Sequence, residues 1–303
     1  MLVTASIPEL RSALAARRAL GPVAFVPTMG ALHEGHLSLV RIARAEAATV
    51  VVSIFVNPLQ FAPTEDLAKY PRTPEKDLEL LRGENVDAVF CPVASEFYPP
   101  EFSTSITVAG VSEGEEGAVR PGHFAGVATV VAKLFHVVGP DVAVFGRKDL
   151  QQAAVVARMI EDLDFPVRLV VAPISREDDG LARSSRNVYL TAAERKKAAA
   201  FPRALFSAAR RVAEGEPVPA VEAGVRQELE TEGFSVDYAE VVDPATMQRV
   251  SRPVAGAAFA AAVRVGKIRL LDNVVIGSSP NVSIGSLPNV LIDSSDDLIG
   301  GGS

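Results

Sequence analysis

The stretch of residues 23–58, "VAFVPTMGALHEGHLSLVRIARAEAATVVVSIFVNP", contains two apolar runs separated by a segment with helical spacing. The first run ends at a proline, and Leu37 and Val40 then recur among polar residues as they do on one face of a helix. Residues 49–56 form the second run, which is rich in valine. The stretch therefore predicts a strand, a helix and a second strand, the repeating unit of a parallel α/β sheet.

The same alternation continues through the first part of the chain. A helix is predicted at residues 73–86, where Thr73 is a candidate N-cap followed by proline. Further strands are predicted at 87–93, 141–146 and 165–174, and further helices at 124–139 and 148–164. We therefore expect residues 1–173 to form a Rossmann-like, doubly wound parallel sheet that binds the ligands.

The pattern changes near residue 174, where a polar segment, residues 175–187, precedes a helical one. The predicted helix at 191–215 opens with a capping box formed by Thr191 and Glu194. A second helix, at 218–233, is followed by β-rich segments at 234–244 and 257–272. Residues 174–276 are therefore predicted to form a smaller α+β domain, which we expect to act as a lid.

Residues 277–303 belong to a degenerate octapeptide repeat that begins at Asp272: DNVVIGSS, PNVSIGSL, PNVLIDSS, DDLIGGGS. Such repeats can pair as short edge strands. The abundance of serine, glycine, proline and asparagine favours a flexible tail instead, and we assign it no chemistry.

Composition excludes several classes of function. With 303 residues, 48% of them hydrophobic, the chain can bury a sizeable core. A net charge of −7 and the lack of a basic block argue against a nucleic-acid partner. The single cysteine, Cys91, excludes an internal disulfide and fits a reducing cytoplasm. No signal peptide or long apolar span is visible, so we expect a cytoplasmic protein with no membrane partner.

His33 and His36 lie at the predicted junction of a strand and a helix. Ligands of parallel sheets bind at this edge, where helix N-termini expose unpaired N–H groups. Two imidazoles can donate hydrogen bonds or add positive charge, and thus stabilise charge that builds up on a phosphate. Gly30 and Gly35 would relieve the turn and admit a ligand. The alternative is that His36 caps the helix and His33 lies on the surface. A zinc pair is less favoured, because no third ligand is adjacent.

Other polar side chains follow predicted strands or lie on predicted loops. Each has an ordinary structural alternative, such as a solvated lysine, a polar turn or a strand-end cap. They are Asn57 and Gln60 in "FVNPLQF", Arg120 and His123 in "RPGHF", Lys148, Asp149 and Gln152 in "FGRKDLQQ", and Ser184, Ser185 and Arg186 in "LARSSRN". Cationic and hydroxyl groups among them suit phosphate oxygens, and the amides suit hydroxyls and carboxylates.

Six motifs together resemble one known family. "PTMGALHEGH", "FVNPLQF", "YPR", "RPGHFAGVATVV", "FGRKDLQQ" and "DGLARSSRNVYL" occur in the order and approximate spacing of the pantothenate synthetases, which belong to the nucleotidyltransferase superfamily with an H-x-G-H motif. The resemblance runs from about residue 1 to residue 276. It implies a homodimeric ligase that uses ATP and Mg²⁺: the carboxylate of (R)-pantoate attacks the α-phosphate to form pantoyl adenylate, and β-alanine then displaces AMP to give pantothenate.

The resemblance also implies roles for single residues. His36 would be the proton donor, His33 its partner on the phosphates, and Lys148 and Arg186 would neutralise phosphate charge. The implied ATP-binding residues are Met29, Gly30, Ala31, Leu32, His33, Glu34, Gly35, His36, Gly146, Arg147, Lys148, Asp149, Ser175, Arg183, Ser184, Ser185 and Arg186. Gln60 and Gln152 would hold pantoate, Gln60 also near β-alanine, and Asn57, Tyr70, Arg120 and His123 would line the same cavity.

Asp77 is the implied magnesium ligand, although a solvated helix face is the commoner place for an aspartate in "PEKDLELL". Two positions depart from the family pattern: Leu150 stands where an aromatic residue is common, and Lys76 where a second acid is expected. Two other functions stay open. They are an adenylate-forming enzyme that uses another acid, and a nucleotide-binding module that does not turn over.

Overall fold

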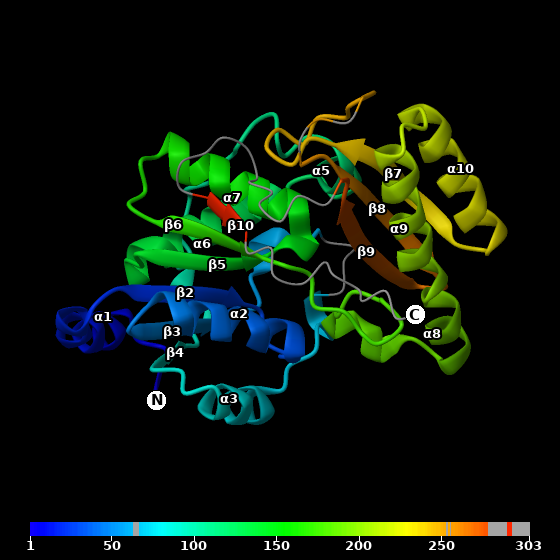
Figure 1. Ribbon diagram of the computed structural model, residues 1–303. Coiled ribbons are helices and arrows are strands. Elements are labelled where there is room, and N and C mark those ends of the chain that lie inside the picture. Colours follow the sequence, from blue (N-terminus) through cyan, green and yellow to red (C-terminus); the bar gives the residue numbers. More distant parts are fainter. Residues whose placement is uncertain (63–66, 253, 255, 278–289, 293–303) are drawn as a thin grey trace. The chain divides into compact units, whose positions relative to one another are not determined.

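The computed structural model describes residues 1–62, 67–252, 254, 256–277 and 290–292. The chain divides into two compact units (Figure 1). Unit 1 comprises Met1–Phe145 and Val155–Ala172, and unit 2 comprises Gly146–Ala154 and the chain from Pro173 onward. The segment Gly146–Ala154 therefore packs with the C-terminal part of the chain, although it lies before residue 173 in the sequence.

Unit 1 is built on a parallel sheet. Its strands are β1 (Leu2–Thr4), β2 (Val23–Thr28), β3 (Thr49–Ile54), β4 (Ala88–Phe90), β5 (Val142–Gly146) and β6 (Arg168–Ala172). They lie in the order β1-β4-β3-β2-β5-β6. The pairs β1/β4, β4/β3, β3/β2 and β2/β5 are all parallel. This confirms the predicted parallel α/β sheet and adds β1, which the sequence pattern did not predict.

Helices cover both faces of this sheet. The helices of this part of the chain are α1 (Ile7–Arg17), α2 (Glu34–Glu46), α3 (Pro74–Gly83), α4 (Ala94–Phe97), α5 (Glu115–Val119), α6 (His123–Val138) and α7 (Leu150–Asp162). Val26 of β2 shares a core cluster with Val40 of α2. Phe25, the preceding residue of β2, contacts Phe135 of α6 instead, with ring centroids 6.4 Å apart. Because successive strand residues point to opposite faces, the sheet is doubly wound as predicted.

The order of the strands sets the ligand-binding edge of unit 1. From β2 the chain moves outward through β3 and β4, and it then returns to β5 on the other side of β2. In open parallel sheets, ligands bind beyond the carboxyl ends of the strands at such a reversal. Residues Met29–His36 follow β2 directly, so they lie at this position.

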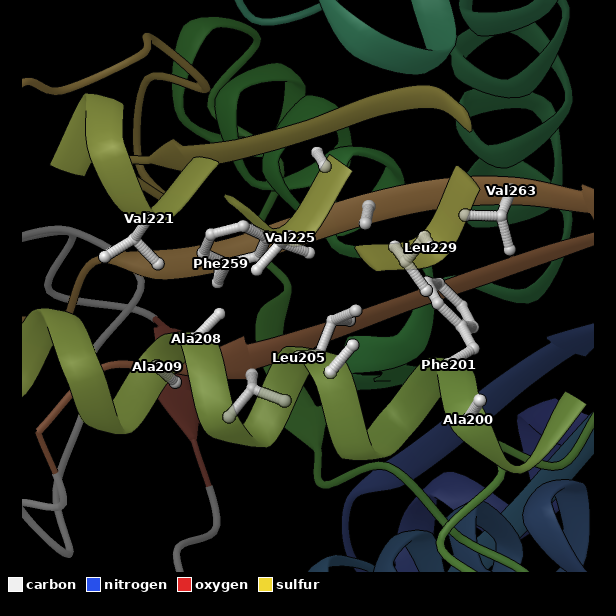
Figure 2. Packing of buried hydrophobic residues seen from close by; sticks show 14 of the residues in the cluster. Ala200, Phe201, Leu205, Ala208, Ala209, Val221, Val225, Leu229, Phe259 and Val263 are labelled. Atoms are coloured by element: carbon white, nitrogen blue, oxygen red, sulfur yellow. The ribbon is translucent and has the colours of Figure 1, made fainter. Parts of the chain in front are cut away.

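Unit 2 contains an antiparallel sheet of β7 (Ser235–Val242), β8 (Ala258–Val265) and β9 (Ile268–Val275), with β8 in the centre. Its helices are α8 (Ala192–Ala198), α9 (Ala200–Ala213) and α10 (Val218–Thr231). Phe259 of β8 is buried together with Leu205 of α9 and Val225 of α10, and Figure 2 shows how these side chains meet. The smaller α+β part of the predicted fold is thus confirmed.

The predicted helix at 191–215 is in fact two helices, which meet at Ala199. Pro202 has no N–H to continue a helix, but it is tolerated in the first turn, and α9 begins two residues before it. The capping box of Thr191 and Glu194 is present at the start of α8, as predicted.

The predicted C-terminal tail falls mostly outside the described residues. A short strand, β10, spans Val290–Ile292, whereas 278–289 and 293–303 are not described. The expectation of a flexible tail therefore stays a prediction. Within the described ranges, no helix has the length and apolar character needed to cross a membrane.

Candidate active site

The loop between β2 and α2 is held in an unusual conformation by Asp77. Gly30 and Ala31 both have left-handed backbones, with φ of +81° and +51°. The Asp77 carboxylate accepts hydrogen bonds from the backbone N–H groups of Ala31 (2.9 Å) and Leu32 (2.8 Å). A Cβ at Gly30 would lie 3.0 Å from Asp77 Oδ2, so glycine suits this position for its space as well as its φ. Asp77 thereby fixes the loop that leads into the histidine pair.

His33 and His36 lie together at the start of α2. His33 is the N-cap residue of the helix, and its backbone N–H donates to His36 Nδ1 at 3.3 Å. The two rings are 4.1 Å apart, centroid to centroid. Since Nδ1 of His36 accepts a hydrogen bond, the proton of its neutral ring sits on Nε2. His36 thus caps the helix, as the structural alternative expected. The same contact also gives His36 a defined Nε2–H donor.

Asn57 and Gln60 form the second part of the site in unit 1. Asn57 is the N-cap of the short helix η2 (Pro58–Gln60), which follows β3, and Gln60 is its last residue. Asn57 Nδ2 donates to Gln60 Oε1 (3.0 Å), and Gln60 Nε2 donates to Met29 Sδ (3.2 Å). A predicted ATP-binding residue and a predicted pantoate-binding residue are thus neighbours.

The Asn57 amide makes hydrogen bonds through both its nitrogen and its oxygen. Its Nδ2 also donates to the carbonyl of Gly126 (3.1 Å), and its Oδ1 accepts from the Leu59 N–H and from the Tyr98 hydroxyl (2.9 Å). Burial raises the pKa of Tyr98, so this hydroxyl keeps its proton and acts as a donor. Asn57 is therefore placed to orient Gln60.

Arg120 and His123 approach the same segment from the start of α6. His123 Nδ1 lies 2.9 Å from the carbonyl oxygen of Gln60, and its Nε2 lies 3.1 Å from Arg120 Nη1. A carbonyl can only accept and a guanidinium can only donate, so His123 is neutral with its proton on Nδ1. The pair fixes the backbone of Gln60. Tyr70 is buried, and its ring packs on Phe61, the residue after Gln60, with centroids 6.0 Å apart.

The side chain of Glu34, in the predicted ATP-binding loop, is engaged elsewhere. Its carboxylate pairs with Arg41 further along α2, on an exposed face. Its backbone, in the first turn of the helix, is therefore the part that suits the ATP-binding role that the resemblance implies.

The remaining candidates lie in unit 2. Gly146 ends β5, and Arg147–Asp149 form the short helix η4 that follows it. Lys148 Nζ lies 3.6 Å from Asp149 Oδ1, and the Lys148 side chain is 22% exposed. Gln152, in the first turn of α7, is half-buried. Leu150, the departure from the family pattern, is a buried apolar residue at the start of the same helix.

Ser175 and Arg183–Arg186 belong to one small hairpin and the turn after it. The backbone N–H of Arg183 donates to the carbonyl of Ser175 (2.9 Å), while its guanidinium pairs with Glu177 at 2.9 Å. Ser184 Oγ accepts from the N–H of Arg186 (3.3 Å) and caps the short helix η5 (Ser185–Tyr189). The hydroxyl of Ser185 and the guanidinium of Arg186 lie on that helix, and both side chains are half-buried.

The predicted magnesium ligand does not fit its surroundings. Asp77 is 1% exposed, and besides the two backbone N–H groups its Oδ1 accepts from the Thr73 hydroxyl at 3.0 Å. Mg²⁺ keeps several waters in a strict octahedron, for which this enclosed carboxylate has no room. Among the described residues no cluster of three metal-binding side chains occurs. The surroundings of Asp77 therefore do not support a metal-binding role.

Sequence reasoning missed one residue of the candidate site, Asn273. It lies on β9, and its side-chain amide holds the carbonyls of Arg147 and Lys148. Nothing in the local sequence distinguishes it from an ordinary polar residue in a strand, because the contact joins residues more than a hundred positions apart.

The doubly wound sheet with an H-x-G-H histidine pair at its topological switch point defines a class of α/β nucleotide-binding enzyme. Comparison with known proteins narrows this class. The model of the pantoate-beta-alanine ligase family matches residues 2–275. The chain therefore belongs to the pantoate-beta-alanine ligase family, and it is an enzyme of the amide-forming ligase type.

Several relatives cover nearly the whole chain. The pantothenate synthetase of Acidothermus cellulolyticus is 53% identical over 278 residues, which are 90% of this chain and 91% of that protein. A crystal structure of pantothenate synthetase from Thermus thermophilus matches with a TM-score of 0.86 at 48% identity and covers 90% of this chain and 99% of that chain.

A more distant structure has bound ligands. It is the pantoate-beta-alanine ligase of Francisella tularensis, complexed with beta-gamma ATP and beta-alanine. It matches with a TM-score of 0.79 at 30% identity and covers 92% of this chain and 99% of that chain.

Proposed function

We propose that this chain condenses (R)-pantoate with β-alanine to pantothenate, with ATP cleaved to AMP and pyrophosphate through a pantoyl adenylate. Family membership across residues 2–275 supports the overall reaction. The observation that supports the adenylate route is the histidine pair at the start of α2, where His36 presents an Nε2–H.

The proposed reaction has two steps. A pantoate carboxylate oxygen attacks the α-phosphorus, the P–O bond to pyrophosphate breaks, and the acyl carbon gains AMP as a leaving group. The amine of β-alanine then attacks that carbon, the bond between carbon and the AMP oxygen breaks, and the amine loses its proton. The first step moves negative charge onto phosphate oxygens, so it is accelerated by positioned donors rather than by an enzyme nucleophile.

In unit 1 we assign to the histidine pair the role of hydrogen-bond donor to the departing pyrophosphate. His36 Nε2–H stabilises charge on the leaving group and can transfer its proton, and His33 adds a second imidazole beside it. The first backbone N–H groups of α2 and its positive dipole end favour the same anion. Gln60, oriented by Asn57 and by His123, is assigned to pantoate and β-alanine, with Tyr70 and Arg120 beside it.

In unit 2 we assign ATP binding to two backbone segments and their side chains. Lys148 and Arg186 supply positive charge, while Gly146, Arg147, Asp149, Ser175 and Arg183–Ser185 shape the segments that carry them. Gln152 is assigned to pantoate. We propose that Mg²⁺ arrives bound to the phosphates of ATP, where it would neutralise their charge.

The proposal also covers the cellular compartment and the oligomeric state. We propose that the reaction takes place in the cytoplasm, where ATP is supplied. The family resemblance favours a homodimer, which sedimentation of the purified chain would test.

The direct test is pyrophosphate release from ATP and Mg²⁺ with (R)-pantoate, before and after β-alanine is added. We expect a burst that depends on pantoate, then sustained turnover to AMP and pantothenate once β-alanine is present. Release with a different acid, but not with pantoate, would point to another adenylate-forming ligase. ATP binding without release for any acid would point to a non-catalytic nucleotide-binding module.

A further inference from the structure

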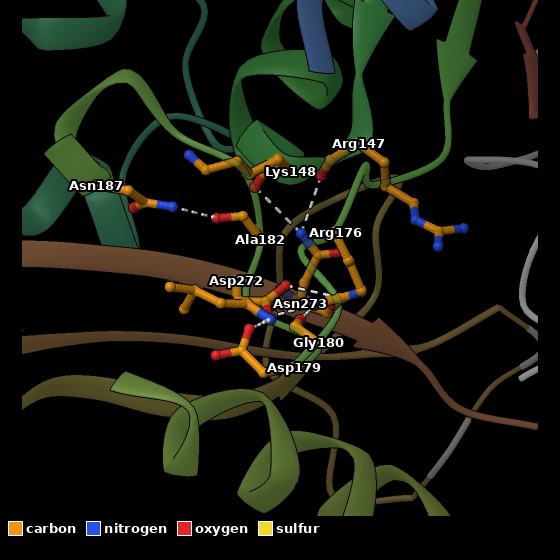
Figure 3. A network of polar contacts seen from close by, with 10 residues as sticks. Arg147, Lys148, Arg176, Asp179, Gly180, Ala182, Asn187, Asp272 and Asn273 are labelled. Carbon is orange, nitrogen blue, oxygen red and sulfur yellow. Dashed lines mark hydrogen bonds and ion pairs between the residues drawn. The ribbon is translucent and has the colours of Figure 1, made fainter. Parts of the chain in front are cut away.

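Two adjacent residues of β9 connect the two ATP-binding segments of unit 2. Asp272 and Asn273 are each 1% exposed. Asn273 Nδ2 donates to the carbonyls of Arg147 (2.9 Å) and Lys148 (3.2 Å), and Figure 3 shows the amide pointing at both. The backbone that carries the Lys148 ammonium is thus fixed by a side chain from a distant strand.

Asp272 holds the second segment through Arg176. Its two oxygens accept from Arg176 Nη1 (2.7 Å) and Nη2 (3.0 Å) in a bidentate pair. The same guanidinium donates to the carbonyls of Gly180 (2.9 Å) and Asn273 (3.2 Å), so it also ties the turn of the hairpin to β9 (Figure 3).

The hairpin that Arg176 anchors leads directly into the predicted phosphate-binding turn. Arg176 and Ala182 pair as an antiparallel bridge, and the N–H of Arg183 donates to the carbonyl of Ser175. Ser184 and Arg186 come next along the chain. Movement of the hairpin would therefore move the Arg186 guanidinium with it.

Stability alone gives a poor account of this arrangement. Asn273 Oδ1 is buried and has no hydrogen-bond partner within the described part of the chain, which is an unfavourable state for a polar atom. The Asp272 carboxylate is fully buried in its pair with Arg176, and such pairs are often no more stabilising than apolar residues of the same size. What both side chains do provide is a fixed position for two backbone segments.

We propose that Asp272 and Asn273 are positioning residues for ATP binding. They fix the Arg147–Lys148 backbone and the Arg176–Ala182 hairpin relative to each other. This inference rests on the proposed function, since it takes ATP as the ligand of both segments. A misplacement of a binding group by about 1 Å can cost roughly a hundredfold in rate, so the loss of either anchor is expected to show in the use of ATP.

The test is Asn273→Asp, which turns the amide donor into an oxygen that faces two carbonyl oxygens. We expect the KM for ATP to rise about tenfold or more and the KM for β-alanine to stay near its original value. The matched control is Asp237→Asn, which weakens a half-buried ion pair with Arg269 (2.6 Å) on the same sheet and touches none of the predicted ATP-binding residues. It should lower the melting temperature and leave the KM for ATP unchanged.

Two results would overturn the proposal. One is an unchanged KM for ATP in Asn273→Asp. The other is a fall in melting temperature of Asn273→Asp that is accompanied by an equal rise in KM for ATP, pantoate and β-alanine. If Asn273→Asp does not fold, Asn273→Ser replaces it, because a serine hydroxyl is too short to bridge both carbonyls. A KM for ATP like that of the unmodified chain would overturn the proposal there too.

Calorimetry with ATP and Mg²⁺ alone separates this inference from the proposed function. An unmodified chain that binds ATP in this experiment, but releases no pyrophosphate when (R)-pantoate and β-alanine are then added, would refute the proposed function. Weaker ATP binding by Asn273→Asp in the same experiment would still support the positioning role, and equal binding would contradict it.

Discussion

Replacing His36 with alanine is expected to slow pantoate-dependent pyrophosphate release by about a hundredfold or more, the usual contribution of a positioned proton donor. The reason is the loss of the Nε2–H that would stabilise the departing pyrophosphate. The substitution also removes the acceptor for the His33 N–H, so we expect a loss of stability of about 1 kcal/mol, as for other helix caps. Single-turnover release and a thermal melt measure the two effects separately.

Two further variants show whether the slower reaction results from loss of the proton donor or from loss of the helix cap. His36→Gln keeps an acceptor for the His33 N–H but cannot transfer a proton at neutral pH, and it should remain slow. His136→Ala is the control, because His136 is an exposed histidine in the last turn of α6 and should behave as the unmodified chain does. Full activity of His36→Gln would show that the ring acts only as a cap.

Replacing Asp77 with asparagine is expected to impair both folding and ATP binding. The carboxylate accepts from two backbone N–H groups of the left-handed loop and from Thr73, and an amide can supply only one acceptor oxygen. A buried N–H left without a partner costs about 1–3 kcal/mol, so a fall in unfolding free energy of that size should appear in urea melts. The KM for ATP should rise because residues 30–33 lose their support.

The magnesium dependence of the same variant separates two accounts of Asp77. If the carboxylate only organises the loop, the Mg²⁺ concentration that gives half-maximal rate should be unchanged. Glu75→Gln, in the exposed first turn of the same helix, is the matched control and should alter neither property. A variant as stable as the unmodified chain, with a strongly raised Mg²⁺ requirement, would show that Asp77 binds the metal.

Much of the fold could be predicted, because hydrophobic periodicity reports burial directly. The runs that became β2, β3 and β5 are continuous apolar segments, as expected for strands covered on both faces. Strand β1 was missed because it has only three residues, of which Thr4 alone is buried. The helix break at Ala199 could have been predicted, because Pro202 is tolerated only in the first turn of a helix and therefore indicates a new helix start.

The candidate site could be predicted less completely. Motifs identified the loop with His33 and His36, whose chemistry depends on residue type and on position after a strand. They could not show that Asp77 faces the loop backbone, nor that Asn273 holds the lysine segment. Both contacts join residues that lie far apart in the sequence, and such contacts depend on tertiary packing that no local pattern encodes.

The measurement that tests the central claim most directly is the fate of oxygen from (R)-pantoate labelled with ¹⁸O in its carboxylate. Adenylation places one of these oxygens between carbon and phosphorus, and attack by β-alanine leaves it on AMP. We therefore predict AMP with one ¹⁸O per turnover and unlabelled pyrophosphate. ADP with labelled inorganic phosphate, or AMP without label, would contradict the pantoyl adenylate route.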